Sequence, residues 1–587
     1  MIKKFLIIAT LLILAFFVIS NENFKIIASG IAIFLIGMHF MEDGFKLFSG
    51  GTLEKVLEKF TNTAFKSLIT GFITTSIVQS SSLISVIVIS FLSVELISLA
   101  QGMAIVFGAN LGSTTTAWIV SALGLKIKIS LYAMPMIIFG VLFRFSSNRT
   151  YIGLGNILLG LGFIFLGISY MKDGFDTLKD SIDLAAYSVG GYLGILIYIV
   201  IGAIATVVIQ SSSATMAIII TALAGANILY IDALALAIGA NVGTTVTAVI
   251  GSLTSNENGK RLAFGHFVFN ITTGLVAVAL IYILKDIVDI LAPIVGIEDD
   301  NYSMKLALFH TIFNLLGIAV LYPFIGVIVN LANKIISDKA KKYSKPKYLD
   351  KANIKIPYNA MVSIQKEVIH LYENAQKAIL HSLSMHTTNL KSEKDIEYAI
   401  NNPAKIDTNL DDIYQNDLKS LYSDIIEFAL ISQQNMNQEQ NKYVSDLKLS
   451  SNIIVKILKD TRDIQKNMNF YLSSKNEFIK QEYIDLKKEL ARIILIVNDL
   501  KDKDLDDVET STQIQMEKDN LAKFDFISNG RIDELIRNEK ITSKMATSLI
   551  NDSTSICNIC INLLRIANIL FVKDEKLRSL GEINETK

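Results

Sequence analysis

Residues 209–215 read IQSSSAT and place one glutamine and three consecutive serines inside an otherwise apolar stretch of the chain. Apolar sequence flanks the motif on both sides, with GAIATVVI ending at residue 209 and MAIIITALA beginning at residue 216. A structural explanation is available, because Ser and Gln hydrogen-bond between helices that pack in a membrane. It leaves one fact unexplained: residues 78–83 read VQSSSL, so the same QSSS tetrapeptide occurs twice.

The chain contains an internal duplication around these two motifs. Three blocks recur in the same order, two of them at one offset without gaps and the third shifted by one residue. The matched blocks are GFITTSIVQSSS at 71–82 with GAIATVVIQSSS at 202–213, GANLGSTTT at 108–116 with GANVGTTVT at 239–247, and GMHFMEDGF at 37–45 with GISYMKDGF at 167–175. A matched order of this kind predicts two structural repeats, from about 24–149 and about 151–284.

Composition divides the 587 residues into two halves, although 51% of them are hydrophobic overall and the formal net charge is zero. Up to about Ile336 the apolar runs reach the roughly 20 residues that cross a bilayer. After Ser337 the chain becomes polar and rich in charge, so a transmembrane domain at 1–337 is expected to precede a soluble part. The two cysteines, Cys557 and Cys560, predict no disulfide framework, and nothing in the balance of charge points to a nucleic-acid partner.

Eight segments are expected to cross the membrane, and two longer ones to enter it and return. Ala64–Leu96 and Tyr192–Ala226 carry a QSSS motif in their middle, so each is expected to form a re-entrant hairpin, enclosed by protein or beside a cavity. The expected crossings are Phe5–Ser20, Ile26–Met41, Leu99–Leu123, Ile129–Phe145, Ile152–Met171, Ile231–Leu253, Leu262–Leu284 and Leu306–Ile336. Three crossings in each repeat invert one repeat relative to the other. The even total places both termini on one side.

The distribution of lysines predicts that both termini lie in the cytoplasm. Lys3 and Lys4 precede the first crossing, and eight lysines lie in the segment 334–355 that follows the last one, as the positive-inside rule requires. Lys126 and Lys128 fall on the outer side and do not fit. Residues 5–20 have a signal peptide as their alternative interpretation.

The chemistry of the repeated motifs favours an anion together with a cation. Inverted repeats with broken segments at the membrane midplane are typical of secondary transporters. A QSSS motif that opens a half-helix presents free amides and hydroxyl donors to an anion, and the amide and hydroxyl oxygens of the GAN blocks suit sodium. Since neither motif contains Lys or Arg, the anion is expected to need a bound cation, which predicts coupled transport.

The paired QSSS motifs and the paired GAN-x-G-T blocks resemble the sodium/phosphate cotransporter family, which contains the animal type II transporters and their bacterial relatives. The resemblance covers about residues 24–336. It implies an all-α polytopic membrane protein of the bacterial plasma membrane that moves inorganic phosphate by alternating access, with sodium as coupling ion, no other cofactor, and a homodimer as one possible assembly. It nominates for phosphate Gln79, Ser80, Ser81, Ser82, Gln210, Ser211, Ser212 and Ser213, and for sodium Asn110, Thr114, Thr115, Asn241, Thr244 and Thr245. The first GAN block departs from the second, with Ser113 in place of Thr244 and Thr115 in place of Val246.

A further polar pair recurs in RLAFGHFVFN at 261–270 and KLALFHTIFN at 305–314. His266 with Asn270, and His310 with Asn314, are each four residues apart and therefore share a helix face. Two interpretations stay open, a polar strip along the transport pathway and hydrogen bonds that fix helix packing.

The polar half is expected to be a helical bundle. Ile364, Val368, Leu371, Ala375 and Ile379 recur every three or four residues, as in an amphipathic helix. We expect a basic linker at 338–356, a cytoplasmic antiparallel bundle at 357–573 and a polar tail at 574–587. By its place in the chain the bundle resembles the PhoU-like domains of bacterial family members, which implies a regulatory role. Such domains bind metal through clustered acidic residues, and Asp407, Asp411 and Asp412 fit either that role or a solvated helix start.

Other function classes fit less well. A serine-dependent enzyme needs a base beside the nucleophile, but neither QSSS has a nearby His or Lys in sequence, and one serine would suffice, so we expect no enzyme. A channel fits poorly, because a fixed paired site suits alternating access better than conduction. The remaining alternative is a membrane phosphate sensor, with the bundle as its output and no net transport.

Overall fold

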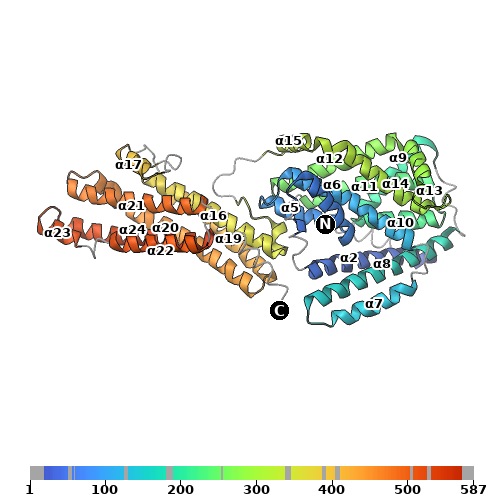
Figure 1. Cartoon of the computed structure of the whole chain (residues 1–587), viewed down its shortest axis with the longest axis horizontal. Coiled ribbons are helices and arrows are strands. Elements are labelled where there is room, and N and C mark those ends of the chain that lie inside the picture. The colour runs from blue at the N-terminus through green and yellow to red at the C-terminus, as the bar shows by residue number, and fades with distance from the viewer. Residues whose placement is uncertain are drawn as a thin grey trace. The chain divides into compact units, whose positions relative to one another are not determined.

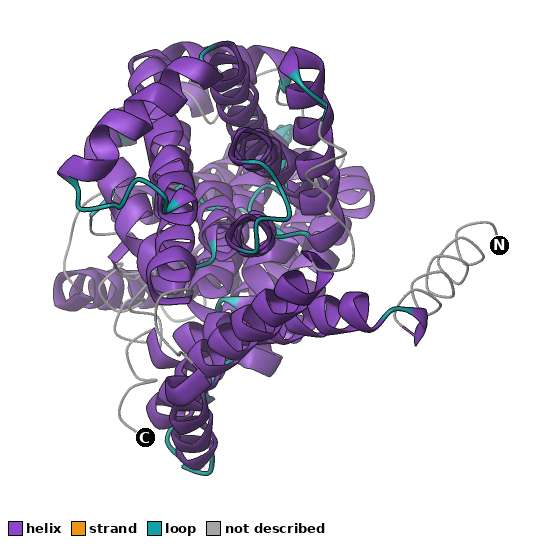
Figure 2. Cartoon of the chain, turned by 90° about the vertical axis from the view of Figure 1, so that its right-hand side faces the viewer, coloured by secondary structure: helices purple, strands orange, loops and turns teal. Residues whose placement is uncertain are grey.

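The computed structural model describes residues 19–49, 56–57, 60–124, 130–179, 189–252, 255–337, 346–385, 392–402, 410–502, 507–524 and 530–571. This part of the chain is helical throughout and contains no strand (Figure 2). The chain divides into two compact units, Met1–Asp338 and Lys339–Asn584 (Figure 1). Nearly all of the expected crossing Phe5–Ser20, the start of the expected linker and the whole tail lie outside the described residues.

The two repeats fold into equivalent series of helices. Helices α5 and α10 both follow a QSSS glutamine and have thirteen residues each, with starts that are 131 residues apart. The first series is α2 (Glu22–Ser49), α4 (Ala64–Val78), α5 (Ser81–Ser93), α6 (Leu99–Trp118) and α7 (Ser130–Arg144). The second series is α8 (Arg149–Lys179), α9 (Gly191–Ile209), α10 (Ser212–Ala224), α11 (Tyr230–Ser252) and α12 (Glu257–Ala279).

Glycines allow the same close helix contact in both repeats. A Cβ atom on Gly71 of α4 would lie 2.1 Å from the carbonyl oxygen of Ile105 on α6. The equivalent atom on Gly202 of α9 would lie 2.2 Å from the carbonyl oxygen of Leu236 on α11. Only glycine permits backbones to approach so closely. The duplication found in the sequence therefore extends to the packing of the helices that carry the QSSS and GAN blocks.

Helices α2 and α8 hold the equivalent place in the two repeats, and they pack antiparallel along a seam of glycines. Gly30, Gly37 and Gly44 of α2 lie against the backbone of Met171, Ile164 and Ile157 in turn. The α8 glycines that meet α2 are Gly153, Gly160, Gly167 and Gly174. Because the glycines recur every seven residues, they stay on one face over the length of both helices.

The helices after the second repeat differ from the expectation. The predicted crossing Leu262–Leu284 is wrong at its end, because α12 stops at Ala279 and a separate helix, α13 (Ile281–Ile294), follows. Charged residues end the apolar run there: Lys285 and Lys305 both form ion pairs with Asp289, at 3.0 and 2.9 Å. The last expected crossing is α14 (Tyr302–Leu321) and α15 (Ile325–Ile335), joined by a 3₁₀ turn. The turn contains Pro323, which cannot donate a backbone hydrogen bond.

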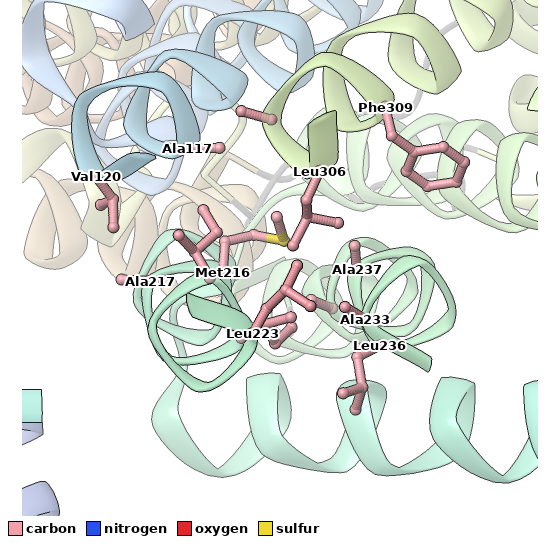
Figure 3. Close-up of a cluster of buried hydrophobic side chains, with 14 of the residues drawn as sticks. Ala117, Val120, Met216, Ala217, Leu223, Ala233, Leu236, Ala237, Leu306 and Phe309 are labelled. Atoms are coloured by element: carbon pink, nitrogen blue, oxygen red, sulfur yellow. The ribbon is translucent and has the colours of Figure 1, made fainter. Parts of the chain in front are cut away.

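The apolar core of this unit forms where α10, α11, α14 and the end of α6 meet. Met216 and Ala217 on α10, Ala233 on α11 and Phe309 on α14 are at most 1% exposed. Figure 3 shows Met216 of α10 meeting Leu306 of α14 between these helices, while Ala217 lies on the side of α10 that faces Val120. The second QSSS motif precedes α10, so its helix is fixed by burial on several sides.

Eight described helices are long and apolar enough to cross a membrane, seven of them in the first unit, so the chain is a multi-pass membrane protein. The seven in the first unit differ from the eight expected crossings, of which Phe5–Ser20 lies almost wholly outside the described residues. Gly191–Ile209 is one of the seven, whereas α7 has only 15 residues. The eighth, Ser543–Leu570, is α24 of the second unit. There Asp552 accepts a hydrogen bond of 2.6 Å from buried Tyr483, which indicates the core of a bundle and not a span.

The second unit is a helical bundle, as predicted. All five residues of the predicted stripe on α16 (Pro357–Ser382) are buried. The other helices are α17 (Glu393–Asn401), α18 (Leu410–Ile413), α19 (Lys419–Ser432), α20 (Gln438–Leu472), α21 (Glu477–Asp502), α22 (Asp507–Phe524), α23 (Arg531–Arg537) and α24 (Ser543–Leu570). Cys560 is fully buried in α24.

Candidate functional site

Both QSSS motifs lie at a break between two helices. Gln79 has φ 58° and ψ 22°, and Gln210 has φ 59° and ψ 24°, so each glutamine ends its helix in the left-handed conformation. For a residue other than glycine that conformation costs about 1–2 kcal/mol. The same unfavourable geometry at both motifs shows that the break is a built feature of each repeat.

The serine after each glutamine caps the next helix. Ser80 Oγ accepts a hydrogen bond from the amide of Leu83, and Ser211 Oγ accepts one from the amide of Ala214, both at 3.2 Å. The amides of the two residues in between have no carbonyl of their own helix to bond. Such helix starts attract anions. In the described part of the chain, Ser81, Ser82 and Ser212 form no side-chain hydrogen bond, so their hydroxyls remain available.

Two threonines of α6 hold the side chain of Gln79. Its Nε2 donates to Thr115 Oγ1 at 2.7 Å, and its Oε1 accepts from Thr116 Oγ1 at 2.7 Å. Thr116 Oγ1 also lies 3.4 Å from Ser213 Oγ of the second motif. One threonine of the first GAN block therefore contacts both QSSS motifs and brings the two repeats together at one place.

Gln210 is free where Gln79 is held. It is exposed, and in the described part of the chain it forms no side-chain hydrogen bond. The residue equivalent to Thr115 is Val246, which has no hydroxyl, and the residue equivalent to Thr116 is Thr247, which donates instead to the carbonyl of Thr244. The departure between the GAN blocks noted in the sequence thus makes the two glutamines unequal.

Helix α2 borders the first serine of both motifs. Ser80 Oγ donates to Glu42 Oε2 at 3.3 Å, and Ser211 Oγ lies 3.9 Å from Met38 Sδ. Met38 and Glu42 are one helical turn apart. Sequence reasoning identified the block that contains them as part of the repeat but assigned no function to either residue, because the contact to QSSS exists only in the folded chain.

The threonines predicted to bind sodium donate their hydroxyl protons to their own helix. Thr114 and Thr115 donate to the carbonyls of Leu111 and Gly112, each at 2.7 Å. Thr244 and Thr245 do the same to Ala240 and Val242, at 3.1 and 2.7 Å. Once the proton is used, a hydroxyl has only its lone pairs to offer, which suits a cation better than an anion.

Asn110 and Asn241, the asparagines of the GAN blocks, meet at a third asparagine. Their Nδ2 atoms donate to Asn270 Oδ1 at 3.0 and 3.3 Å, and His266 Nε2 lies 3.3 Å from Asn110 Oδ1. The expected pair on α12 therefore links the two repeats, all of it buried.

The second expected pair, on α14, is less engaged. Asn314 Nδ2 donates only to the carbonyl of His310, at 2.9 Å. Among the described residues, three buried polar atoms of this region lack a partner: Asn270 Nδ2, His310 Nδ1 and Asn314 Oδ1. Buried groups of this kind are commonly satisfied by bound water.

Asp411 and Asp412, two of the acidic residues considered for metal in the second unit, join no metal-binding group among the described residues. Asp411 pairs with Arg462 at 2.8 Å, and Asp407 lies outside the described residues. Nowhere in the described ranges do three or more His, Cys, Asp or Glu side chains gather in a way that could hold a metal ion.

Comparison with known proteins identifies relatives of the first unit. Residues 33–173 and 195–297 match the model of a family described as Na+/Pi-cotransporter. YjbB of Salmonella typhimurium LT2, named as a candidate inorganic phosphate export protein, is 26% identical over 353 residues, which cover 58% of this chain and 62% of YjbB. YjbB of Escherichia coli K12 is 25% identical with the same coverage. YqeW of Bacillus subtilis 168, an uncharacterised protein, is 27% identical over 317 residues, 53% of this chain and 97% of YqeW. The chain thus spans less than two thirds of the length of YjbB, and no solved structure matches it.

Proposed function

Because residues 33–173 and 195–297 of this chain match the family described as Na+/Pi-cotransporter, we propose that the protein moves inorganic phosphate across the bacterial plasma membrane in a sodium-coupled, alternating-access cycle. The name that YjbB carries refers to phosphate export and supports phosphate as the transported ion. The observation that carries the proposal is the position of Thr116, whose hydroxyl bonds Gln79 and lies 3.4 Å from Ser213. Two motifs that are 131 residues apart in the chain therefore contribute to a single site.

In this site, hydrogen-bond donors are assigned to phosphate and oxygen lone pairs to sodium. The QSSS motifs offer the amides at the starts of α5 and α10 and the hydroxyls of Ser81, Ser82 and Ser212, which are donors for phosphate oxygens. Four threonines of the GAN blocks donate their hydroxyl protons to backbone carbonyls. Their oxygen lone pairs can therefore coordinate sodium. Gln79 and Gln210 can contact either ion, since an amide side chain has both a donor and an acceptor.

The arrangement of the repeats supports alternating access. Equivalent helices α2 and α8 run antiparallel, which is the relation expected of inverted repeats. We place the two broken pairs, α4 with α5 and α9 with α10, as re-entrant hairpins from opposite sides, and both termini in the cytoplasm. In this conformation the Gln79 motif is closed by Thr115 and Thr116, whereas the Gln210 motif is open. If the Gln79 motif opened and the Gln210 motif closed, the bound ions would become accessible from the other side of the membrane.

The helical second unit regulates transport in this proposal and does not form the pathway. All residues assigned to phosphate and sodium lie before residue 250, and the two units are compact on their own. Its place after the transport unit, and its buried apolar stripes, support a separate regulatory domain.

Purified protein in liposomes tests the proposal. Uptake of radioactive phosphate is measured with sodium varied on each side, and phosphate binding is measured by calorimetry with and without sodium. Uptake driven by a sodium gradient, together with phosphate affinity that rises with sodium, is the expected result, because linked sites strengthen each other by the same factor. Phosphate binding without any flux would indicate the sensor, and neither binding nor flux would refute the phosphate site.

A further inference from the structure

Glu42 places a carboxylate in direct contact with the first QSSS motif. Its Oε2 accepts a hydrogen bond of 3.3 Å from Ser80 Oγ, and its side chain is 29% exposed. Ser80 caps α5 at the point where the proposed phosphate site begins. A phosphate ion bound there would meet a negative charge next to its own, which disfavours binding unless that charge is neutralised.

Lys46 pairs with Glu42 but does not neutralise the cluster that Glu42 forms with Asp43. Lys46 Nζ lies 2.8 Å from Glu42 Oε1, but it is also 3.6 Å from Asp43 Oδ1. His39 lies 3.3 Å from Asp43 and does not contact Glu42 in the described structure. Two carboxylates therefore share one ammonium group, and the cluster keeps a negative charge when His39 is neutral.

The helices that pack against α2 bring no further cation to this level. Helix α10 has no charged residue, and α4 has only Lys66 near its start. Helix α8 contacts Met41 at Gly160, and its cations Arg149, Lys172 and Lys179 lie eleven or more residues away, roughly 16 Å along the helix. Arg144 of α7 stacks on the ring of Phe40, two residues before Glu42.

Only the first repeat has this carboxylate. In the matched blocks GMHFMEDGF and GISYMKDGF, the position of Glu42 is held by Lys172 in the second repeat. Ser211, the counterpart of Ser80, faces the sulfur of Met38 instead. The duplication thus gave two similar anion-binding helix starts, and just one of them carries a fixed negative charge.

We propose that Glu42 and Ser80 form a binding site for a monovalent cation, either sodium or a proton, and that its occupation makes the first motif competent for phosphate. This inference rests on the assignment of phosphate to the QSSS motifs and adds a site separate from the threonines of α6 and α11. A carboxylate oxygen and a hydroxyl oxygen are suitable ligands for sodium. Neutralisation of Glu42 replaces repulsion of phosphate by attraction or by a neutral contact.

The test compares E42Q with D43N in purified full-length protein, because both remove one negative charge from neighbouring positions of α2 and only Glu42 contacts Ser80. Calorimetry gives the apparent dissociation constant of inorganic phosphate at low and high sodium, at two pH values. In the wild type, the added cation should strengthen phosphate binding about tenfold, within the usual range for linked ligands. In D43N, Lys46 pairs with Glu42 alone, so this dependence should become weaker but remain, because the carboxylate in contact with Ser80 is still present. In E42Q this dependence should fall below about twofold, with phosphate bound well in the absence of the cation.

The cation whose effect on phosphate binding is lost in E42Q is the one that binds at Glu42 and Ser80. Loss of the sodium dependence alone assigns sodium, and loss of the pH dependence alone assigns a proton; both outcomes support the proposal. Equal dependence on sodium and pH in E42Q and the wild type overturns it. If wild-type protein binds no phosphate, and S80A changes nothing, the proposed function fails and not merely this site. Should E42Q fail to fold, E42D shifts the carboxylate: a weaker half-saturation for the cation is expected, and an unchanged one overturns the proposal.

Discussion

Replacement of Thr116 by valine removes a hydroxyl that contacts both QSSS motifs. Thr116 is 6% exposed, and it donates to Gln79 Oε1 at 2.7 Å. Valine keeps the branched shape but leaves that buried amide oxygen without its donor, at a cost of about 1–3 kcal/mol. If Gln79 must be held for phosphate to bind, T116V should weaken phosphate binding about 5- to 150-fold.

The second repeat supplies a matched control. Thr247 is the equivalent residue in α11, and its hydroxyl donates to the carbonyl of Thr244 and touches neither motif. T247V should change phosphate affinity by less than about threefold, because the donation to a helix carbonyl has only a small net effect. Phosphate uptake and calorimetric affinity are measured for both variants, with expression and melting temperature recorded alongside.

Two results would contradict this reasoning. Equal losses of affinity in T116V and T247V would mean that the contact between the motifs has no special role. A lower melting temperature of T116V with unchanged affinity would assign the hydroxyl to packing alone. A double-mutant cycle with Q79A refines the test, since residues in contact should show an interaction energy of about 0.5–3 kcal/mol.

Three further predictions concern the serines, the second unit and a buried lysine. S81A and S212A, at equivalent positions of the two motifs, should each weaken phosphate binding about tenfold to hundredfold, because hydrogen bonds to a charged ligand contribute about 1.5–3 kcal/mol; near-normal uptake with lowered melting temperature would assign these serines to packing. A protein ending after Ser337 should still move phosphate in liposomes with altered regulation, and loss of flux from a folded, inserted protein would argue against it. Burial lowers the pKa of Lys487 to about 8, below its value in the unfolded chain, so the second unit should gain stability as the pH rises from about 8 to about 10; melting curves of the wild type and K487M that respond to pH in parallel would disprove this.

Much of the membrane unit could be predicted because its repeats leave a strong pattern. The duplication, the helix breaks at Gln79 and Gln210, and the paired GAN helices follow from blocks that match in order and spacing. The apolar stripe of α16 was also sufficient to predict a buried helix face. In each case a local pattern determines a local structure, and the pattern is visible without any knowledge of the fold.

The parts that could not be predicted depend on contacts between distant residues. The roles of Glu42 and Thr116 arise only when α2, α5, α6 and α10 pack together. The boundary between α12 and α13 was missed because the apolar run continues through Leu280, while the ion pair of Asp289 with Lys305 joins α13 to α14 and exists only in the folded chain. Hydropathy also selects α24, whose apolar residues serve the core of a bundle.

The glycine seam between α2 and α8 has a consequence for how such a chain could arise. Gly37 lies against Ile164 and Gly167 lies against Phe34, and these are the same two positions of the repeat with their roles exchanged. Contacts that are reciprocal in this way define an isologous interface, the kind that joins two identical subunits about a twofold axis. A single ancestral repeat, inserted into the membrane in both orientations, would have carried a surface complementary to its own inverted copy. Fusion of two genes would then have preserved an existing dimer, and later changes, such as Glu42 in one repeat and Lys172 at the equivalent position of the other, would have made its halves different.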